Sequence, residues 1–334
     1  MLNRSGGVLL NISSLPSKYG IGGFGAETEK FADFLIESGF HYWQTLPVTT
    51  VGTGWSPYSG TSAFAGNFMY VDPDRLVRNG LISREDAEKA RYDYPYAVDY
   101  AFCSGSKRAL LLRAFANFGD RASLDGYEAR TPWLRDYALF MAIKDAHGGA
   151  PWWEWEEKYR RASVSRKEEL KNEFSEGYRY YVFEQYIFDA QWREVRRMLA
   201  EKKIRLIGDM PMYVSLDSAD VWGDPSQFKL DENMAPTEVA GVPPDYFSAD
   251  GQLWGNPLYD YGKMRKDGFR WWLGRFDRMA ELYDVLRIDH FRAFSAYWAV
   301  DANAVTAKEG KWRKGVGKEL FAEVFKKHSP DSFI

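Results

Sequence analysis

Two carboxylates that follow apolar runs are the first candidates for chemistry in this sequence. The segment DVLRIDHFRAF passes from an apolar run into Arg287, Asp289 and His290. Side chains two positions apart in a strand point to the same face, so Arg287 and Asp289 would share one face. An arginine beside a carboxylate favours its ionised form, and an ionised carboxylate in a pocket can act as the nucleophile of a glycosyl transfer. A second acid, Asp209, ends another apolar run in KIRLIGDMP.

Two other interpretations of these residues stay open. An Arg–Asp pair can be a structural ion pair that ties a strand to a loop. A metal ion could be held by Asp209, Asp289 and His290, as in a metal-assisted barrel hydrolase. The sequence has neither an HExxH motif nor the Cys/His spacing of zinc sites, so we expect no metal.

Composition limits the classes of partner. The 334 residues carry a net charge of -3, which does not favour a nucleic-acid partner. No apolar run is long enough to span a membrane, and the N-terminus lacks a signal-peptide pattern. The single cysteine, Cys103, suits a reducing compartment, so we expect a cytoplasmic protein. The 17% aromatic content fits either a bulky core or a site that stacks on sugar rings.

Strand-like and helix-like segments alternate along the chain. We predict buried strands in GGVLLNIS, HYWQTLPV, KIRLIGDMP and YDVLRIDHF, and helices at about 26–38, 177–202 and 317–328. This order predicts an α/β fold of the (β/α) barrel type, whose chemistry lies at the C-terminal ends of the strands. An open doubly wound sheet is the alternative, but no GxGxxG motif opens a helix after a strand.

Three regions differ in texture. Residues 1–73 contain the first barrel units and end in a long loop, 49–73, rich in Gly, Ser and aromatic residues. Charged residues and helix formers dominate 74–175, which we predict to be a mainly helical insertion. Residues 176–334 return to barrel units and contain the segment 241–260, which we interpret as an aromatic lid loop.

The sequence closely resembles the amylomaltases, or 4-α-glucanotransferases, of glycoside hydrolase family 77. The resemblance runs from near residue 5 to the last residue and is carried by GVLLNISSLPSKYGIGGFG, YWQTLPV, SPYSGTSAFAGN, GDMPMYVSLDSADVW, GVPPDYFSADGQLWGNPLYD and LRIDHFRAFSAYW. It implies a (β/α)8 barrel with a helical insertion. It also implies transfer of α-1,4-glucan segments between maltodextrins, with maltose or glucose as acceptors, and no cofactor.

The resemblance also implies roles for single residues. Asp289 would be the nucleophile and Arg287 its support. The residues that would bind sugar are Tyr58, Asp209 and Trp254 and, with weaker support, Ser56, Asn256 and His290.

A retaining transfer needs a second carboxylate about 5–5.5 Å from the nucleophile. In the family this acid/base is a glutamate in a motif like IAEDLG, on the strand after the nucleophile, and this sequence ends at SFI, where that strand is expected. We therefore expect a barrel that is truncated and a chain with little activity alone. A complementary C-terminal chain or self-association could complete it. The alternative is a non-catalytic glucan-binding fragment.

Overall fold

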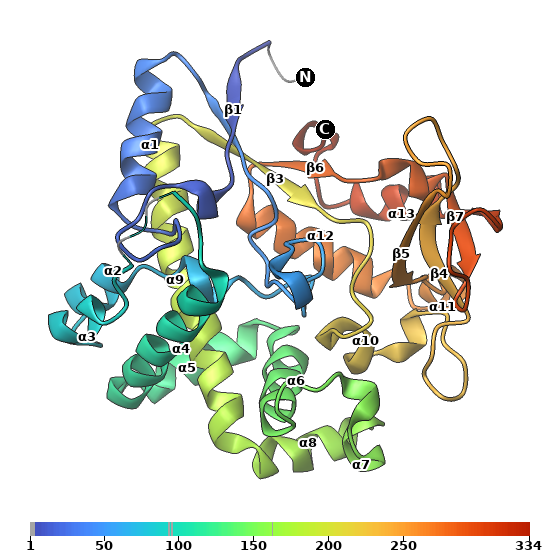
Figure 1. The fold of residues 1–334 in the computed structure, drawn as a ribbon, viewed down its shortest axis with the longest axis horizontal. Coiled ribbons are helices and arrows are strands. Elements are labelled where there is room, and N and C mark those ends of the chain that lie inside the picture. Colours follow the sequence, from blue (N-terminus) through green and yellow to red (C-terminus); the bar gives the residue numbers. More distant parts are fainter. Residues whose placement is uncertain (1–3, 93, 95, 162) are drawn as a thin grey trace.

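The computed structural model describes residues 4–92, 94, 96–161 and 163–334 (Figure 1). Its central element is a parallel sheet formed by β1 (Gly7–Leu9), β2 (Tyr42–Gln44), β3 (Arg205–Met210) and β6 (Val285–Ile288). The strand order is β1-β2-β3-β6, and each neighbouring pair is parallel. All four strands lie within the segments that the sequence predicted, because each is a short apolar run between turn residues.

Helices connect these strands and cover the sheet. They are α1 (Ala26–Glu37) between β1 and β2, the long α9 (Ser175–Glu201) before β3, and α12 (Arg270–Leu282) before β6. One apolar stripe of α9 is buried and consists of Phe188, Trp192, Val195 and Leu199. The Trp192 indole also donates a hydrogen bond to the Leu282 carbonyl, 3.1 Å away, so α9 is tied to the end of α12.

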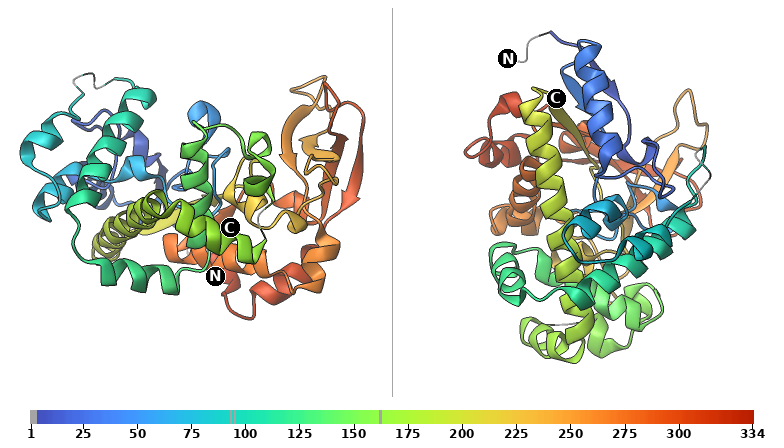
Figure 2. Two further views of the ribbon diagram at one scale, coloured as in Figure 1. Left: turned by 90° about the horizontal axis from the view of Figure 1, so that it is seen from below. Right: turned by 90° about the vertical axis from the view of Figure 1, so that its left-hand side faces the viewer.

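A helical region lies between the second and third strands, at the lower left of Figure 1. It contains α2 (Pro73–Arg78), α3 (Arg84–Glu88), α4 (Tyr100–Asn117), α5 (Arg121–Arg130), α6 (Leu134–Ala146), α7 (Glu157–Arg160) and α8 (Val164–Glu173). Local signals start these helices: Ser83 and Asp86 form a complete capping box on α3. In the left view of Figure 2, α2 to α5 and the C-terminal sheet described next lie at opposite ends of the molecule, with α6 to α8 between them.

A second sheet was not predicted from the sequence. It is antiparallel and consists of β4 (Glu238–Val242), β5 (Gln252–Pro257), β7 (Ala296–Asp301) and β8 (Gly310–Lys314), in the order β5-β4-β7-β8. The segment interpreted as a lid loop is therefore largely a β-hairpin, in which Gly241 pairs with Leu253. Strand β4 of this hairpin pairs with β7, which lies about 60 residues away in sequence, and no local sequence pattern indicates such a pairing.

The remaining helices are short. They are α10 (Ala219–Gly223), α11 (Tyr261–Lys266) and α13 (Gly317–Val324), together with 3-10 turns at Ile12–Ser14, Thr53–Trp55, Phe68–Tyr70, Trp152–Glu154, Pro225–Gln227, Phe291–Phe294 and Pro330–Ser332. Within the described ranges, no helix combines the length and the apolar character needed to cross a bilayer.

The α/β class with a parallel sheet is confirmed. Among the described residues the four parallel strands form an open arc and do not close a barrel. Strand β6 is an edge strand, and its outer side is met by the last residues, where Ile334 donates its backbone N–H to the Leu286 carbonyl at 3.0 Å. The C-terminal ends of β3 and β6 lie side by side, and this is where both predicted acids are found.

Candidate active site

The pairing of β3 with β6 brings the predicted charged residues together. Asp209 pairs with Arg287 and Met210 with Ile288. Directly paired residues in a sheet share a face, so the Asp209 carboxylate and the Arg287 guanidinium project from the same face. Asp289, two residues beyond Arg287, follows on that face as the sequence predicted.

Arg287 contacts both acids. Its Nη1 donates to Asp209 Oδ1 at 2.5 Å, and its Nη2 donates to Asp289 Oδ1 at 3.2 Å. Tyr58, from the loop 49–73, donates its hydroxyl proton to the other oxygen of Asp209, Oδ2, at 2.7 Å. Asp209 thus has both oxygens engaged and is 2% exposed, whereas the Asp289 side chain is 38% exposed.

The two acids therefore sit in different environments. Burial raises the pKa of Asp209, and the hydrogen bonds from Tyr58 and Arg287 oppose that rise. Burial also raises the pKa of the Tyr58 hydroxyl, which lies beside the Asp209 carboxylate, so Tyr58 stays protonated as a donor. Burial lowers the pKa of Arg287, but the two carboxylates more than reverse this and hold it above its ordinary value. The arrangement is a buried, fully bonded acid next to a partly exposed one.

Backbone geometry aims Asp289 and His290. The strand ends at Ile288, and the Asp289 N–H donates to the Met210 carbonyl at 3.0 Å. His290 has a φ of 47°, in the left-handed region, which turns the chain sharply after Asp289. The His290 ring lies edge-on to Trp254, with 4.9 Å between ring centroids. Burial lowers the pKa of His290, which favours a neutral ring.

These contacts bear on the metal alternative. The imidazole of His290 faces aromatic rings of Trp254 and Tyr213. In the part of the chain that the structure describes, no three His, Cys, Asp or Glu side chains are grouped to hold a metal ion.

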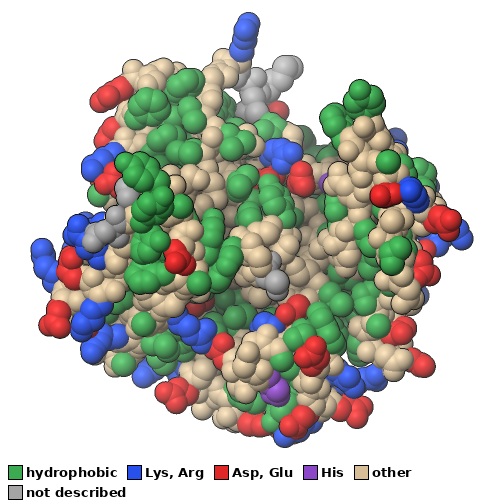
Figure 3. All heavy atoms as spheres, in the orientation of Figure 1, with side chains coloured by type: hydrophobic (Ala, Val, Ile, Leu, Met, Phe, Trp, Pro, Cys, Tyr) green, Lys and Arg blue, Asp and Glu red, His purple; other side chains and the backbone are tan. Residues whose placement is uncertain are grey.

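Trp254 lies on β5, not on a free loop. It is 38% exposed and packs against Tyr213 and His290, so an aromatic surface borders the charged site. The surface of the molecule is hollowed between the antiparallel sheet and the main body (Figure 3). An exposed indole beside a carboxylate is the combination that a sugar ring requires.

Two weaker candidates have structural partners. Asn256 donates its side-chain amide to the Val214 carbonyl at 2.8 Å, and the Ser56 hydroxyl accepts from the Tyr58 N–H at 3.2 Å. Sequence reasoning missed Tyr213, which is buried between Trp254 and Tyr259 and whose hydroxyl has no hydrogen-bond partner among the described residues. Its position four residues after Asp209 in GDMPMY was the available signal.

Comparison with known proteins identifies the family. The family model described as 4-alpha-glucanotransferase matches residues 10–332. The chain belongs to the 4-alpha-glucanotransferase family. It is 44% identical over 335 residues to the 4-alpha-glucanotransferase of Aquifex aeolicus, an alignment that covers 99% of this chain and 68% of that protein. It is 43% identical to the enzyme of the same name from Thermus thermophilus, over 97% of this chain and 65% of the relative.

Solved structures agree with this family assignment. The amylomaltase from Streptococcus agalactiae in complex with acarbose is 40% identical, with a TM-score of 0.92 over 99% of this chain and 68% of that one. The amylomaltase from Corynebacterium glutamicum is 17% identical, with a TM-score of 0.75 over 96% of this chain and 45% of that one, and it supports the fold alone. The chain thus spans about two thirds of the length of these curated 4-alpha-glucanotransferases.

Proposed function

We propose that this site transfers α-1,4-glucan segments between maltodextrins, with maltose or glucose as acceptors. The observation that carries the proposal is the pair of acids held by one guanidinium, with the partly exposed carboxylate of Asp289 followed in the chain by His290, whose ring packs against the exposed indole of Trp254. Membership of the 4-alpha-glucanotransferase family supports the substrate class. Glucans offer both apolar ring faces and hydroxyl edges, which suit Trp254 and the polar groups of the site.

In the first step, a carboxylate oxygen of Asp289 attacks the anomeric carbon of the donor glucan. A new C1–O bond forms, the old glycosidic C1–O bond breaks, and the leaving 4-hydroxyl takes up a proton. In the second step, the 4-hydroxyl of an acceptor glucan attacks C1 and loses its proton, and the Asp289 carboxylate is released. Two inversions give net retention of the α configuration.

The neighbours of Asp289 support this chemistry. Arg287 holds one oxygen of Asp289 and leaves the other available for attack. The same guanidinium fixes Asp209, so the two carboxylates are held apart from each other in defined positions. Tyr58 and Asp209 together present a bonded pair that can contact sugar hydroxyls near the cleavage point.

The aromatic hairpin suits a role in excluding water. Strands β4 and β5 carry Trp254 beside the site, and the turn between them presents Tyr246 and Phe247, which are 98% and 92% exposed. Transfer exceeds hydrolysis only when a sugar displaces water from the covalent intermediate. Apolar side chains at the hairpin tip would cover a bound glucan and favour the acceptor.

The acid/base group of this reaction is not found among the described residues of the site. Asp209 is buried, and both of its oxygens are bonded to Tyr58 and Arg287, so it is poorly placed to pass a proton to a leaving group. A second carboxylate must therefore reach the site from polypeptide that packs beside it.

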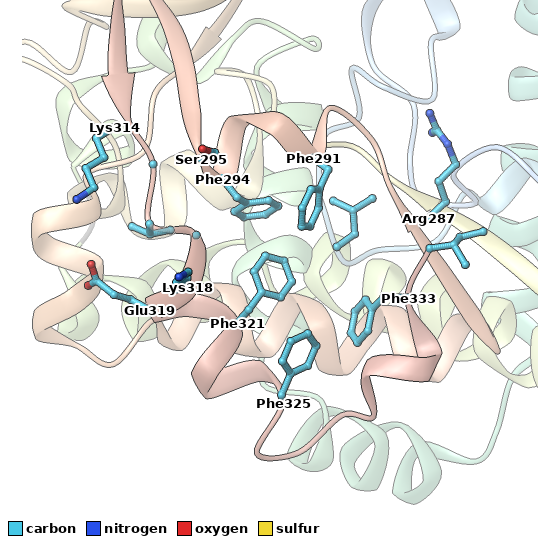
Figure 4. A pocket seen from close by; sticks show the side chains of 15 residues that line it. Arg287, Phe291, Phe294, Ser295, Lys314, Lys318, Glu319, Phe321, Phe325 and Phe333 are labelled. Carbon is cyan, nitrogen blue, oxygen red and sulfur yellow. The ribbon is translucent and has the colours of Figure 1, made fainter. Parts of the chain in front are cut away.

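A large apolar groove lies next to Arg287, with a volume of about 1260 Å3 (Figure 4). Its aromatic lining consists of Phe291, Phe294, Phe321, Phe325 and Phe333. Phe291 and Phe325 are 56% and 44% exposed. Exposed apolar surface of this extent marks an interaction site. The edge strand β6, which is paired on its outer side only through the bridge between Leu286 and Phe333 among the described residues, borders it.

We propose that this groove takes a complementary C-terminal segment, for which the third of each relative's length that the alignments leave unmatched gives room. Such a segment would add parallel strands beside β6, where Ile334 already begins this pairing, and would supply the acid/base carboxylate next to Arg287. A second copy of this chain is the competing occupant of the groove, and its binding there would be self-association. The chain on its own would have little transfer activity.

Separation of maltotriose products tests the proposal. The chain is incubated with maltotriose, alone and together with a separately produced C-terminal third of the Aquifex aeolicus relative. Glucose and longer maltodextrins should form in the mixture and not in a mixture that contains Asp289→Asn. Unchanged maltotriose in the mixture, despite a complex seen by light scattering, would contradict the transferase. A dimer of the chain alone, with activity, would favour self-association.

A non-catalytic glucan-binding fragment is the second candidate function, and the open arc of strands favours it for the isolated chain. Calorimetry with acarbose separates the transferase from the binding fragment. If the chain is part of a transferase, Asp289→Asn should still bind acarbose and should lose turnover.

A cytoplasmic location remains a prediction from the single cysteine, Cys103.

A further inference from the structure

The loop 49–73 carries Tyr58 to the site, and its base is a short antiparallel ladder. Thr49 pairs with Gly66, with hydrogen bonds from Thr50 N–H to the Ala65 carbonyl and from Asn67 N–H to the Val48 carbonyl, both 2.9 Å. In this geometry the N–H and C=O of Gly66 point away from the partner strand. Buried backbone groups of this kind need other partners.

A buried glutamine provides them. Gln185 on α9 is 0% exposed; its Oε1 accepts from the Gly66 N–H at 2.7 Å, and its Nε2 donates to the Gly66 carbonyl at 3.0 Å. Its amide therefore acts as a third strand would. Gln191, six residues later on α9, does the same at Asp72, with bonds of 2.7 Å and 3.2 Å.

Three more buried side chains bind the same stretch of backbone. Asp220 on α10 accepts from the Ala63 N–H at 2.8 Å, Arg278 on α12 donates to the Phe64 carbonyl at 3.0 Å, and Lys107 on α4 donates to the Val71 carbonyl at 2.6 Å. We call the set the loop clamp, made up of Lys107, Gln185, Gln191, Asp220 and Arg278. Four helices thus fix residues 63–72 through polar contacts that have no role in the chemistry itself.

The tip of the loop is held by its closure on the base and by stacking of Trp55 on Tyr100 of α4, with 5.8 Å between ring centroids. Residues 52–60 close back on the base, where a Cβ on Gly60 would lie 2.2 Å from the Thr50 carbonyl oxygen. The side chain of Tyr58 then reaches Asp209. The position of Tyr58 against Asp209 depends on where the base of the loop is fixed, because the tip is too tightly closed to adjust independently.

We infer that Gln185 and Gln191 are positioning residues, which set Tyr58 against Asp209 by fixing the base of the loop 49–73 to α9. This inference rests on the proposed role of Tyr58 in sugar binding. The glutamines do not touch the site; they act through the backbone of Gly66 and Asp72. Loss of either amide would free the base and let the hydroxyl of Tyr58 drift from Asp209.

Hydrogen–deuterium exchange on the 334-residue chain tests whether the glutamines fix the base of the loop. Gln185→Met keeps the size of the side chain and removes both hydrogen bonds to Gly66, together with the one from Nε2 to Glu184 on the same helix, so exchange in 61–72 and in the tip 52–60 should rise about tenfold or more. Gln227→Met is the matched control, since Gln227 is an equally buried glutamine that bonds to Asp224 and Asp267. The inference would be overturned if exchange in 61–72 did not change, or if it rose while exchange in the tip 52–60 did not change.

A double-mutant cycle on acarbose affinity tests whether Gln185 acts on the site through Tyr58. Gln185→Met should weaken binding about tenfold in the wild-type background and less than about twofold in a Tyr58→Phe background. Equal weakening in both backgrounds would mean that Gln185 does not act through Tyr58. A wild-type chain that binds no acarbose would count against the proposed function. In that case, hydrogen–deuterium exchange in 61–72 and 52–60 would still decide whether the glutamines position the loop.

Discussion

Glu184 gives a sharp prediction because it is a carboxylate in the core. It lies on α9 and is 1% exposed, among Tyr137 of α6, Tyr180 of the same helix and Gln185, with Arg108 of α4 nearby. Each of the three hydrogen-bond partners donates to it, at 3.2–3.3 Å. Burial outweighs these donors and raises the pKa of Glu184 to about 7 from a model-peptide value of 4.5.

The sign of the pH effect follows from that direction. A carboxyl with a raised pKa in the folded state contributes stability that is fully present below pH 4.5 and is lost as the pH rises through 7. The rise in pKa corresponds to about 3 kcal/mol between pH 4.5 and pH 8. Glutamine has the same size and no charge to bury. Relative to wild type, Glu184→Gln should therefore gain about 3 kcal/mol in free energy of unfolding between pH 4.5 and pH 8.

Urea unfolding followed by tryptophan fluorescence at pH 4.5, 6 and 8 measures this difference. Glu201→Gln is the control, because it makes the same substitution at an exposed carboxylate on the same helix. A stability difference for Glu184→Gln that is independent of pH, or a variant that is less stable than wild type at pH 8, would refute the reasoning.

Three further predictions concern the core and the site. Arg278→Met removes the cation that pairs with the buried carboxylate of Asp189 and leaves it the hydrogen bond from the Tyr127 hydroxyl, so the free energy of unfolding should fall by about 3–5 kcal/mol in urea titration, and a small loss would contradict the buried pair. Gly66→Ala would place a Cβ 2.2 Å from the Phe188 ring, so it should lower the midpoint of thermal unfolding through a cost of about 1–3 kcal/mol; an unchanged midpoint would show that the core can adjust. Removal of metals with EDTA should leave product formation from maltotriose unchanged in the complemented chain, and a loss that zinc or calcium restores would revive a metal-assisted site at Asp289.

Local patterns predicted much of the parallel sheet and part of the site. The strand runs ending at Asp209 and Asp289 were recognised because each is apolar and followed by polar residues, and the period of two placed Arg287 beside Asp289. The same patterns placed the long helix α9 within about two residues of its observed bounds.

Features set by distant pairing could not be read in this way. The register that brings Asp209 opposite Arg287 joins residues 78 apart, and the hairpin with Trp254 exists because β7 supplies an edge. The glutamine contacts to the loop are invisible for the same reason, since Gln185 and Gly66 lie 119 positions apart. Sequence reasoning therefore found the chemical groups and the parallel strands that carry them, and missed the long-range pairings that bring them together.

The most direct test of the account is to trap the sugar on Asp289 with α-maltotriosyl fluoride. Fluoride leaves without protonation, so the first step needs the nucleophile and no acid/base group. After an acid quench, mass spectrometry of peptides from the complemented and the isolated chain should show a maltotriosyl ester on Asp289, and none in Asp289→Asn. An ester on Asp209, or fluoride release that persists in Asp289→Asn, would contradict the claim that Asp289 is the attacking group.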